Sequence, residues 1–112
     1  MSSVRLEKIG SLVKKELSII FRQQMNSHFK GVMVTVTSAR VSPDLALAKV
    51  YLSIFPSQKK DDTMKEIQRH HHYLRKLFGE AVGKQLRKVP ELAFFIDDSL
   101  DYYEEIDKLL KK

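Results

Sequence analysis

The sequence predicts an α+β fold in which helices pack over one face of a three-stranded sheet. Two stretches of the 112-residue chain alternate apolar and polar residues, as strands do, and two others repeat apolar residues every three or four positions, as helices do. A third strand is expected in the short apolar run after Pro90. A chain of this length forms a single domain, which we expect to span residues 1–112.

The first helix is expected over residues 4–21, and two strands over residues 31–39 and 45–55. The helix has one apolar stripe at helical spacing, made of Leu6, Ile9, Val13, Leu17 and Ile20. Both strand regions alternate, and the first is rich in β-branched residues. The link between them, RVSPD, supplies turn-forming residues and is short enough for an antiparallel hairpin.

The second helical region begins near Asp62 and contains a predicted kink. Its apolar stripe consists of Met64, Ile67, His71, Leu74 and Phe78. Gly79 and Gly83 interrupt the pattern before residues 85–88 resume it, and each glycine costs a helix interior about 1 kcal/mol relative to alanine. We therefore expect the glycines to bend or break the helix, ending one segment and beginning another. A short acidic helix over residues 99–110 is expected after the third strand.

Charge is distributed unevenly along the chain. Residues 1–90 hold 17 basic and seven acidic residues, whereas residues 91–112 hold three basic and seven acidic ones, for a net charge of +6. A basic body indicates a polyanionic partner, because clustered positive charge gains from releasing the counterions condensed on nucleic acid. A basic surface that only keeps the protein soluble is the alternative, and composition does not separate the two.

The composition excludes several classes of protein. The chain has no cysteine, which rules out cysteine-based zinc sites, thiol nucleophiles and disulfides. Charges interrupt the N-terminal segment, so it does not read as a signal peptide, and no segment approaches the roughly 20 apolar residues of a membrane span. We expect a cytoplasmic protein without a membrane partner.

Three consecutive histidines, His70, His71 and His72, raise the question of a metal site. Consecutive helical residues lie about 100° apart, so these side chains fan around the helix and do not converge on one ion. Helical metal pairs need i,i+4 spacing, as in H-E-x-x-H, which is absent. We expect no metal site and no cofactor, with His71 packed in the core stripe. The other two histidines are expected to be more exposed, where either could stack on a base or contact phosphate.

Adjacent carboxylates do not indicate a catalytic site. Asp97-Asp98 and Glu104-Glu105 are pairs whose members point in different directions, and no histidine or nucleophile stands at a recognisable spacing from them. We expect no catalytic residues, so the sequence predicts that the protein is not an enzyme.

Cations that avoid the apolar stripes form the candidate RNA-binding surface. Six lie in and around the second helical region: Arg69, Arg75, Lys76, Lys84, Arg87 and Lys88. Five others lie on the first helix, beside the hairpin turn and on the second strand: Arg5, Lys8, Lys15, Arg40 and Lys49. No aromatic platform for bases is visible in the sequence, so we expect contacts chiefly to phosphates and to RNA shape. A merely solvated basic face is the simpler interpretation of the same pattern.

Two stretches of the chain match the sequence signatures of one protein family. In VTVTSARVSPDLALAKVYLS (residues 34–53), the family's hairpin signature is matched by Val41-Ser42, Asp44-Leu45 and Ala48-Lys49-Val50-Tyr51. In LRKVPELAFFIDDS (residues 86–99), the matching residues are Leu86-Arg87, Pro90-Glu91-Leu92, Phe94, Asp97 and Ser99. The two stretches occur in order and at suitable spacing. Together they resemble the ribosome-binding factor A family of bacterial small-subunit assembly factors, and the resemblance runs over nearly the whole chain.

The resemblance implies a type II KH-like fold with a mixed sheet, in which an interrupted helix replaces the GXXG loop that clamps RNA in other KH modules. The GXXG motif is absent here, since GEAVG has three residues between its glycines. The resemblance also implies a non-catalytic factor that binds the immature 30S subunit and its ribosomal RNA. Such a factor assists late maturation and rRNA processing, and has a role in growth at low temperature. We expect a monomer whose acidic C-terminal helix stays off the RNA, packs on the fold or meets a ribosomal protein.

The chain departs from the family pattern in three places. NSHFKG (residues 26–31) stands where Asp-Pro-Arg is frequent, HHH replaces a small residue, any residue and glycine at the helix interruption, and the following connection is about two residues longer. These departures leave the residue at which the helix bends open. A basic protein–protein adaptor that uses the same helices without touching RNA is the alternative function.

Overall fold

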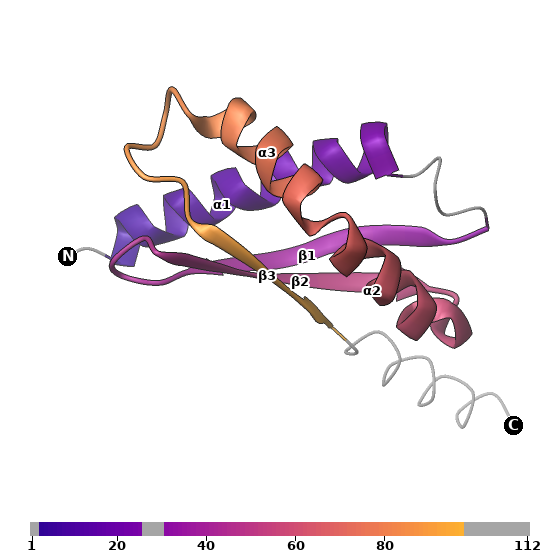
Figure 1. Ribbon diagram of the computed structural model, residues 1–112. Coiled ribbons are helices and arrows are strands. Elements are labelled where there is room, and N and C mark those ends of the chain that lie inside the picture. The colour runs from indigo at the N-terminus through magenta and orange to yellow at the C-terminus, as the bar shows by residue number, and fades with distance from the viewer. Residues whose placement is uncertain (1–2, 26–30, 98–112) are drawn as a thin grey trace, which may run out of the picture.

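The computed structural model describes residues 3–25 and 31–97 of the chain (Figure 1). The elements in order are α1 (Ser3–Ile20), the π-helical turn η1 (Phe21–Met25), β1 (Met33–Val41), β2 (Leu47–Phe55), the 3-10 turn η3 (Ser57–Lys59), α2 (Lys60–Arg69), α3 (His71–Val82) and β3 (Glu91–Ile96). This order confirms the predicted α+β fold. The helix expected over residues 99–110 lies outside the described residues.

The three strands form one mixed sheet in the order β1-β2-β3, with β2 in the centre. β1 and β2 are antiparallel, as the predicted hairpin requires, whereas β2 and β3 are parallel. A parallel pair cannot be joined by a tight turn, and here α2 and α3 supply the crossover. The ladder between β1 and β2 is interrupted between Val36 and Ser38, where Thr37 forms a β-bulge.

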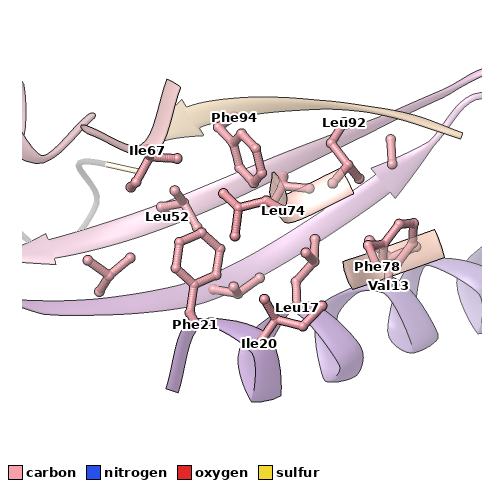
Figure 2. Close-up of a cluster of buried hydrophobic side chains, with 14 of the residues drawn as sticks. Val13, Leu17, Ile20, Phe21, Leu52, Ile67, Leu74, Phe78, Leu92 and Phe94 are labelled. Carbon is pink, nitrogen blue, oxygen red and sulfur yellow. The ribbon is translucent and has the colours of Figure 1, made fainter. Parts of the chain in front are cut away.

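Helices cover one face of the sheet, and the core lies between the two layers. Alternation along β2 points Val50 and Leu52 toward the helices, and both are fully buried. The helices contribute the predicted apolar stripes, and Figure 2 shows the residues of α1, α2 and α3 converging on the strands: Val13, Leu17, Ile20, Ile67, Leu74 and Phe78. Most residues of the predicted stripes therefore form the core, whereas Leu6, Met64 and His71 are only partly buried.

Gly10 allows α1 to approach the sheet closely. A Cβ atom at this position would lie 2.8 Å from the carbonyl oxygen of Ala39 on β1, closer than real Cβ contacts. Two residues farther along α1, Leu12 packs against the core from the other side of the buried stripe. Gly10 thus lets one flank of α1 lie against β1, while Leu12 anchors the opposite flank to the core.

The helix kinks at His70, so the prediction that the glycines interrupt it is wrong for Gly79, whereas Gly83 does end a helical segment as predicted. His70 leaves helical geometry with φ −96° and ψ 16°, and α3 then runs without interruption through Gly79 to Val82. A glycine costs about 1 kcal/mol, whereas burying a side chain such as Phe78 contributes roughly 1.5–3 kcal/mol, so packing on either side of Gly79 keeps the helix intact. Gly83 ends α3, and no helix follows it before β3 in the described chain.

Candidate nucleic-acid interface

The kink between α2 and α3 is stabilised by contacts of its own side chains. Arg69 forms an exposed ion pair with Glu66 at 2.6 Å, and Nε2 of His70 lies 3.6 Å from the other oxygen of the same carboxylate. The His70 amide still donates to the carbonyl oxygens of Glu66 and Ile67, so the backbone ladder continues through the bend. Exposed ion pairs of this kind contribute little stability, and a phosphate could displace Glu66 from Arg69 at small cost.

The three histidines have different surroundings. Nε2 of His71 lies 2.8 Å from the carbonyl oxygen of Leu92, to which it donates, and its ring meets Phe94 edge-on with centroids 6.1 Å apart. His71 is half-buried and packs against β3, as predicted. His72 is exposed at the start of α3. Within the described residues no three histidine or carboxylate side chains gather into a group that could hold a metal ion.

Lys76 lies on the outer side of α3. Leu74 and Phe78 are fully buried, and Lys76, between them in sequence, is about 200° around the helix from Leu74. Tyr73 lies one turn earlier on the same outer side, with 44% of its surface exposed. The outer side of α3 therefore carries a cation and an aromatic ring next to each other.

Arg75 connects α3 to the edge of the sheet. Its Nη2 donates to the carbonyl oxygen of Val89 at 3.2 Å, and its Nε lies 3.1 Å from Oε1 of Glu91. The guanidinium is thus engaged by the segment that enters β3. Among the predicted RNA-binding residues, Arg75 is placed to hold the fold together, because its charge already has a carboxylate partner.

A second group of cations lies at the far end of α3, on the connection to β3. Lys84, Arg87 and Lys88 are all exposed there. The hydroxyl of Ser42, the Ala46 amide and the nearby charge of Lys88 hold the pKa of Asp44 below its usual value. The connection therefore lies beside the hairpin turn, separated from the kink by the roughly 18 Å length of a 12-residue helix.

The predicted cations of α1 extend the surface on the helical side. Arg5, Lys8 and Lys15 are exposed. Lys8 and Lys15 lie on the flank of α1 opposite Gly10, which faces β1, and α1 packs against α3. Nine of the eleven predicted residues thus lie on the helices or on the α3–β3 connection.

Arg40 and Lys49 are separated from the other nine by the sheet. They are partners across the β1–β2 ladder and point to the face that α1, α2 and α3 leave uncovered, which we call the open face. Both side chains are exposed. The eleven predicted residues therefore form two surfaces, not one.

The open face also carries aromatic side chains that the sequence analysis missed. Tyr51 and Phe95 stack with ring centroids 5.6 Å apart and planes at 29°, and Phe55 is 59% exposed. These rings come from β2 and β3, which are far apart in the sequence, so the expectation of no aromatic platform does not hold for the folded chain. Strand alternation could have placed each ring opposite the core, but only the β2–β3 register brings them together.

No helix in the described ranges is long and apolar enough to cross a membrane.

Comparison with known proteins identifies the family. The family model for Ribosome-binding factor A matches residues 5–110. Ribosome-binding factor A of Cytophaga hutchinsonii is 43% identical over 112 residues, which span 100% of this chain and 84% of that protein. The protein of the same name from Christiangramia forsetii is 37% identical over 108 residues, which span 96% of this chain and 82% of that protein.

Solved structures show the same fold. The crystal structure of ribosome-binding factor A from Thermus thermophilus superposes with a TM-score of 0.69 at 19% identity, covering 81% of this chain and 94% of that one. Thermus thermophilus coordinates fitted into a cryo-electron microscopy map of a complex of that factor with the 30S subunit give a TM-score of 0.66 at 19% identity, covering 83% and 96%. With a family match over almost the whole chain and relatives well above 30% identity, this protein belongs to the ribosome-binding factor A family.

Proposed function

We propose that this protein binds the small (30S) ribosomal subunit through the phosphates of its ribosomal RNA and assists late maturation of that RNA. Membership of the family supports a ribosome-binding role, and the Thermus thermophilus factor with the same fold was fitted in a complex with the 30S subunit. The protein acts without catalysis, as a cytoplasmic monomer. The resemblance adds a role in rRNA processing and in growth at low temperature.

The observation that carries the proposal is the set of exposed cations along α3 and its connection to β3. Lys76, Lys84 and Arg87 form no ion pair with any residue that the structure describes, so their charges are available to phosphates. Each phosphate that they neutralise releases a condensed counterion. Lys76 lies on α3, while Lys84 and Arg87 lie on the connection after it. Because α3 packs on α1 and on the sheet, it would hold the first contact at a set distance from the other two, and so hold a local RNA arrangement until maturation proceeds.

The test is a salt series on binding to isolated small subunits. The triple variant Lys76→Glu, Lys84→Glu, Arg87→Glu is compared with Lys14→Glu, Lys59→Glu, Lys65→Glu, which reverses three exposed cations outside the predicted set and changes the net charge equally. Arg75 is left unchanged because its reversal would also break its contact with Glu91. We expect the first triple to weaken binding about 100-fold or more and to reduce the slope of log K against log salt by about 2 to 3. The second triple should change both much less.

Two results would count against this proposal. Equal losses in both triples would show that total charge, not this surface, controls binding. Salt-insensitive binding to a single purified protein would favour the adaptor that makes no RNA contact. Crosslinking to small-subunit precursors supplies an independent check, and an absence of crosslinks from residues 69–88 would place the interface elsewhere.

A further inference from the structure

We propose that the open face of the sheet is a separate binding surface for single-stranded RNA, on which unpaired bases stack on Tyr51, Phe55 and Phe95 while Arg40 and Lys49 contact phosphates. This inference rests on the proposed function in one respect, that the partner is RNA. It concerns a different side of the molecule from α3 and a different form of RNA.

Strand pairing places these residues on one face. Tyr51 pairs with Phe95 across β2 and β3, and Lys49 pairs with Arg40 across β1 and β2. Cross-strand partners point to the same side of a sheet, and alternate residues along β2 share that side. Phe55, four residues beyond Tyr51, therefore belongs to the same face and lies roughly 13 Å from it along the strand.

The face exposes more large apolar surface than any other described part of the molecule. Of the four large hydrophobic side chains that are most exposed, three lie here: Met33 at 67%, Phe55 at 59% and Phe95 at 42%. Met33 and Phe55 are cross-strand partners at one end, and the stacked pair of Tyr51 and Phe95 lies at the middle of β2. The rings are thus spaced to take separate bases along one strand of RNA.

The unpaired charge on the open face is positive. Arg40 and Lys49 have no ion pair among the described residues. Both nearby acidic side chains have partners: Glu91 on β3 pairs with Arg75, and Asp97, directly after β3, accepts a hydrogen bond from Oγ1 of Thr37 at 2.7 Å. The face therefore complements an anion, which favours a nucleic acid over a basic or purely apolar peptide.

Single-stranded RNA has the chemistry that this combination recognises. Every base has a π-face that stacks on aromatic rings, and such stacking contributes about 1–3 kcal/mol per base in proteins that bind single strands. An RNA helix keeps its bases stacked on one another and would offer the rings nothing. A protein partner would use the same residues as apolar area, for which leucine substitutes well for phenylalanine.

The experiment uses the difference between a protein partner, which tolerates leucine in place of phenylalanine, and stacked bases, which need the aromatic ring. Binding of a fluorescein-labelled octamer of uridine to the full chain is followed by anisotropy at low salt, for Phe55→Leu, Phe95→Leu and for the matched control Phe55→Tyr, Phe95→Tyr. The leucine pair keeps most of the apolar area and removes both rings, and we expect it to weaken binding at least 10-fold, since about 1–3 kcal/mol per stack corresponds to about 5- to 150-fold. The tyrosine pair should bind within about twofold of the natural chain.

Salt dependence and chemical shifts complete the test. Two phosphate contacts predict a slope of log K against log salt of about −1.4 for single strands, and Arg40→Gln, Lys49→Gln should abolish most of it. Amide shifts on adding the octamer should map to β1, β2 and β3. Nuclear magnetic resonance spectra of each variant show whether the fold is retained.

The proposal is overturned if the octamer does not bind, if the leucine and tyrosine pairs bind equally, or if the shifts map only to α3 and its connection. Equal binding would identify the face as an apolar surface for a protein. The Lys76→Glu, Lys84→Glu, Arg87→Glu triple separates this proposal from the previous one: it should lose small subunits but keep the octamer. Subunit binding unchanged in that triple would refute the proposed function without affecting the octamer result.

Discussion

Phe94 and Phe95 are neighbours on β3, yet they belong to opposite faces of the sheet. Phe94 is 4% exposed and meets Phe21 edge-on with ring centroids 6.0 Å apart, whereas Phe95 is 42% exposed on the open face. The same residue type thus stabilises the fold in one position and remains accessible to a partner in the next. The covered face carries the hydrophobic core, so a substitution on the open face should cost less stability than one on the covered face.

The largest test of this comparison replaces each phenylalanine by alanine. Phe94→Ala should reduce the free energy of unfolding by about 3–5 kcal/mol, because it leaves a cavity among buried side chains. Phe95→Ala should cost about 1 kcal/mol, the scale of one aromatic pair with Tyr51. Urea denaturation followed by circular dichroism measures both. Equal losses would show that the open face is covered in the folded chain.

Gly10 tests how tightly the covered layer is packed. Gly10→Ala puts a methyl group 2.8 Å from the Ala39 carbonyl oxygen, so α1 must shift away from β1. Overpacking of this kind costs about 1–3 kcal/mol, even though alanine is the better helix former. Thermal denaturation gives the change, and a gain in stability would mean that α1 can move at no cost.

Gly79, in the same helical layer as Gly10, has room for a methyl group where Gly10 has none. A methyl group here would meet only Cγ1 of Val89, at 3.9 Å, which is ordinary contact. Gly79→Ala should therefore stabilise the protein by about 0.5–1 kcal/mol, measured by urea denaturation. If Gly79→Ala instead destabilises the protein, the helix requires a glycine at this position, as a bend there would.

The smallest expected change in stability concerns Asp44 in the turn between β1 and β2, the turn that fixes the register of the two strands. Asp44 accepts hydrogen bonds from Oγ of Ser42 at 2.7 Å and from the Ala46 amide at 3.1 Å. The lowered pKa of Asp44 means that its carboxylate stabilises the fold above its usual value of 3.8, and that this contribution disappears as the pH falls through the lowered value. Between about pH 5 and 2, Asp44→Asn should lose less stability than the natural chain. If stability depends on pH in the same way in Asp44→Asn and in the natural chain, the Asp44 carboxylate does not stabilise the fold.

The sequence predicted the elements and core well because strand alternation and helical spacing are local signals. The prediction from the glycines failed at the kink, because the glycine preference is weaker than the burial of Phe78 and Val82 around it, whereas the family resemblance places the helix interruption at residues 70–72. The sequence contains the glycines, but it does not show which side chains around them are buried. His70, which lies at the bend, carries no general helix-breaking signal.

For the candidate sites, ten of the eleven cations named from the sequence are exposed and Arg75 is half-buried, but the sequence could not assign their neighbours. Arg75 meets Glu91 only because α3 packs beside β3, and Arg40 is separated from Lys76 by the whole sheet. The aromatic residues of the open face depend on the register of β2 and β3, two strands that the whole α2–α3 crossover separates in the chain. Such contacts follow from tertiary structure, which periodicity does not encode.

The bulge at Thr37 reverses the alternation of side chains along β1. Val34 and Val36 face the core, so strict alternation would send Ser38 and Arg40 inward as well. The extra residue instead turns Ala39 inward and Arg40 outward, opposite Lys49. Deleting one residue here would drive a guanidinium toward Gly10 under α1. A single inserted position thus keeps a cation out of the core and creates the positive end of the open face.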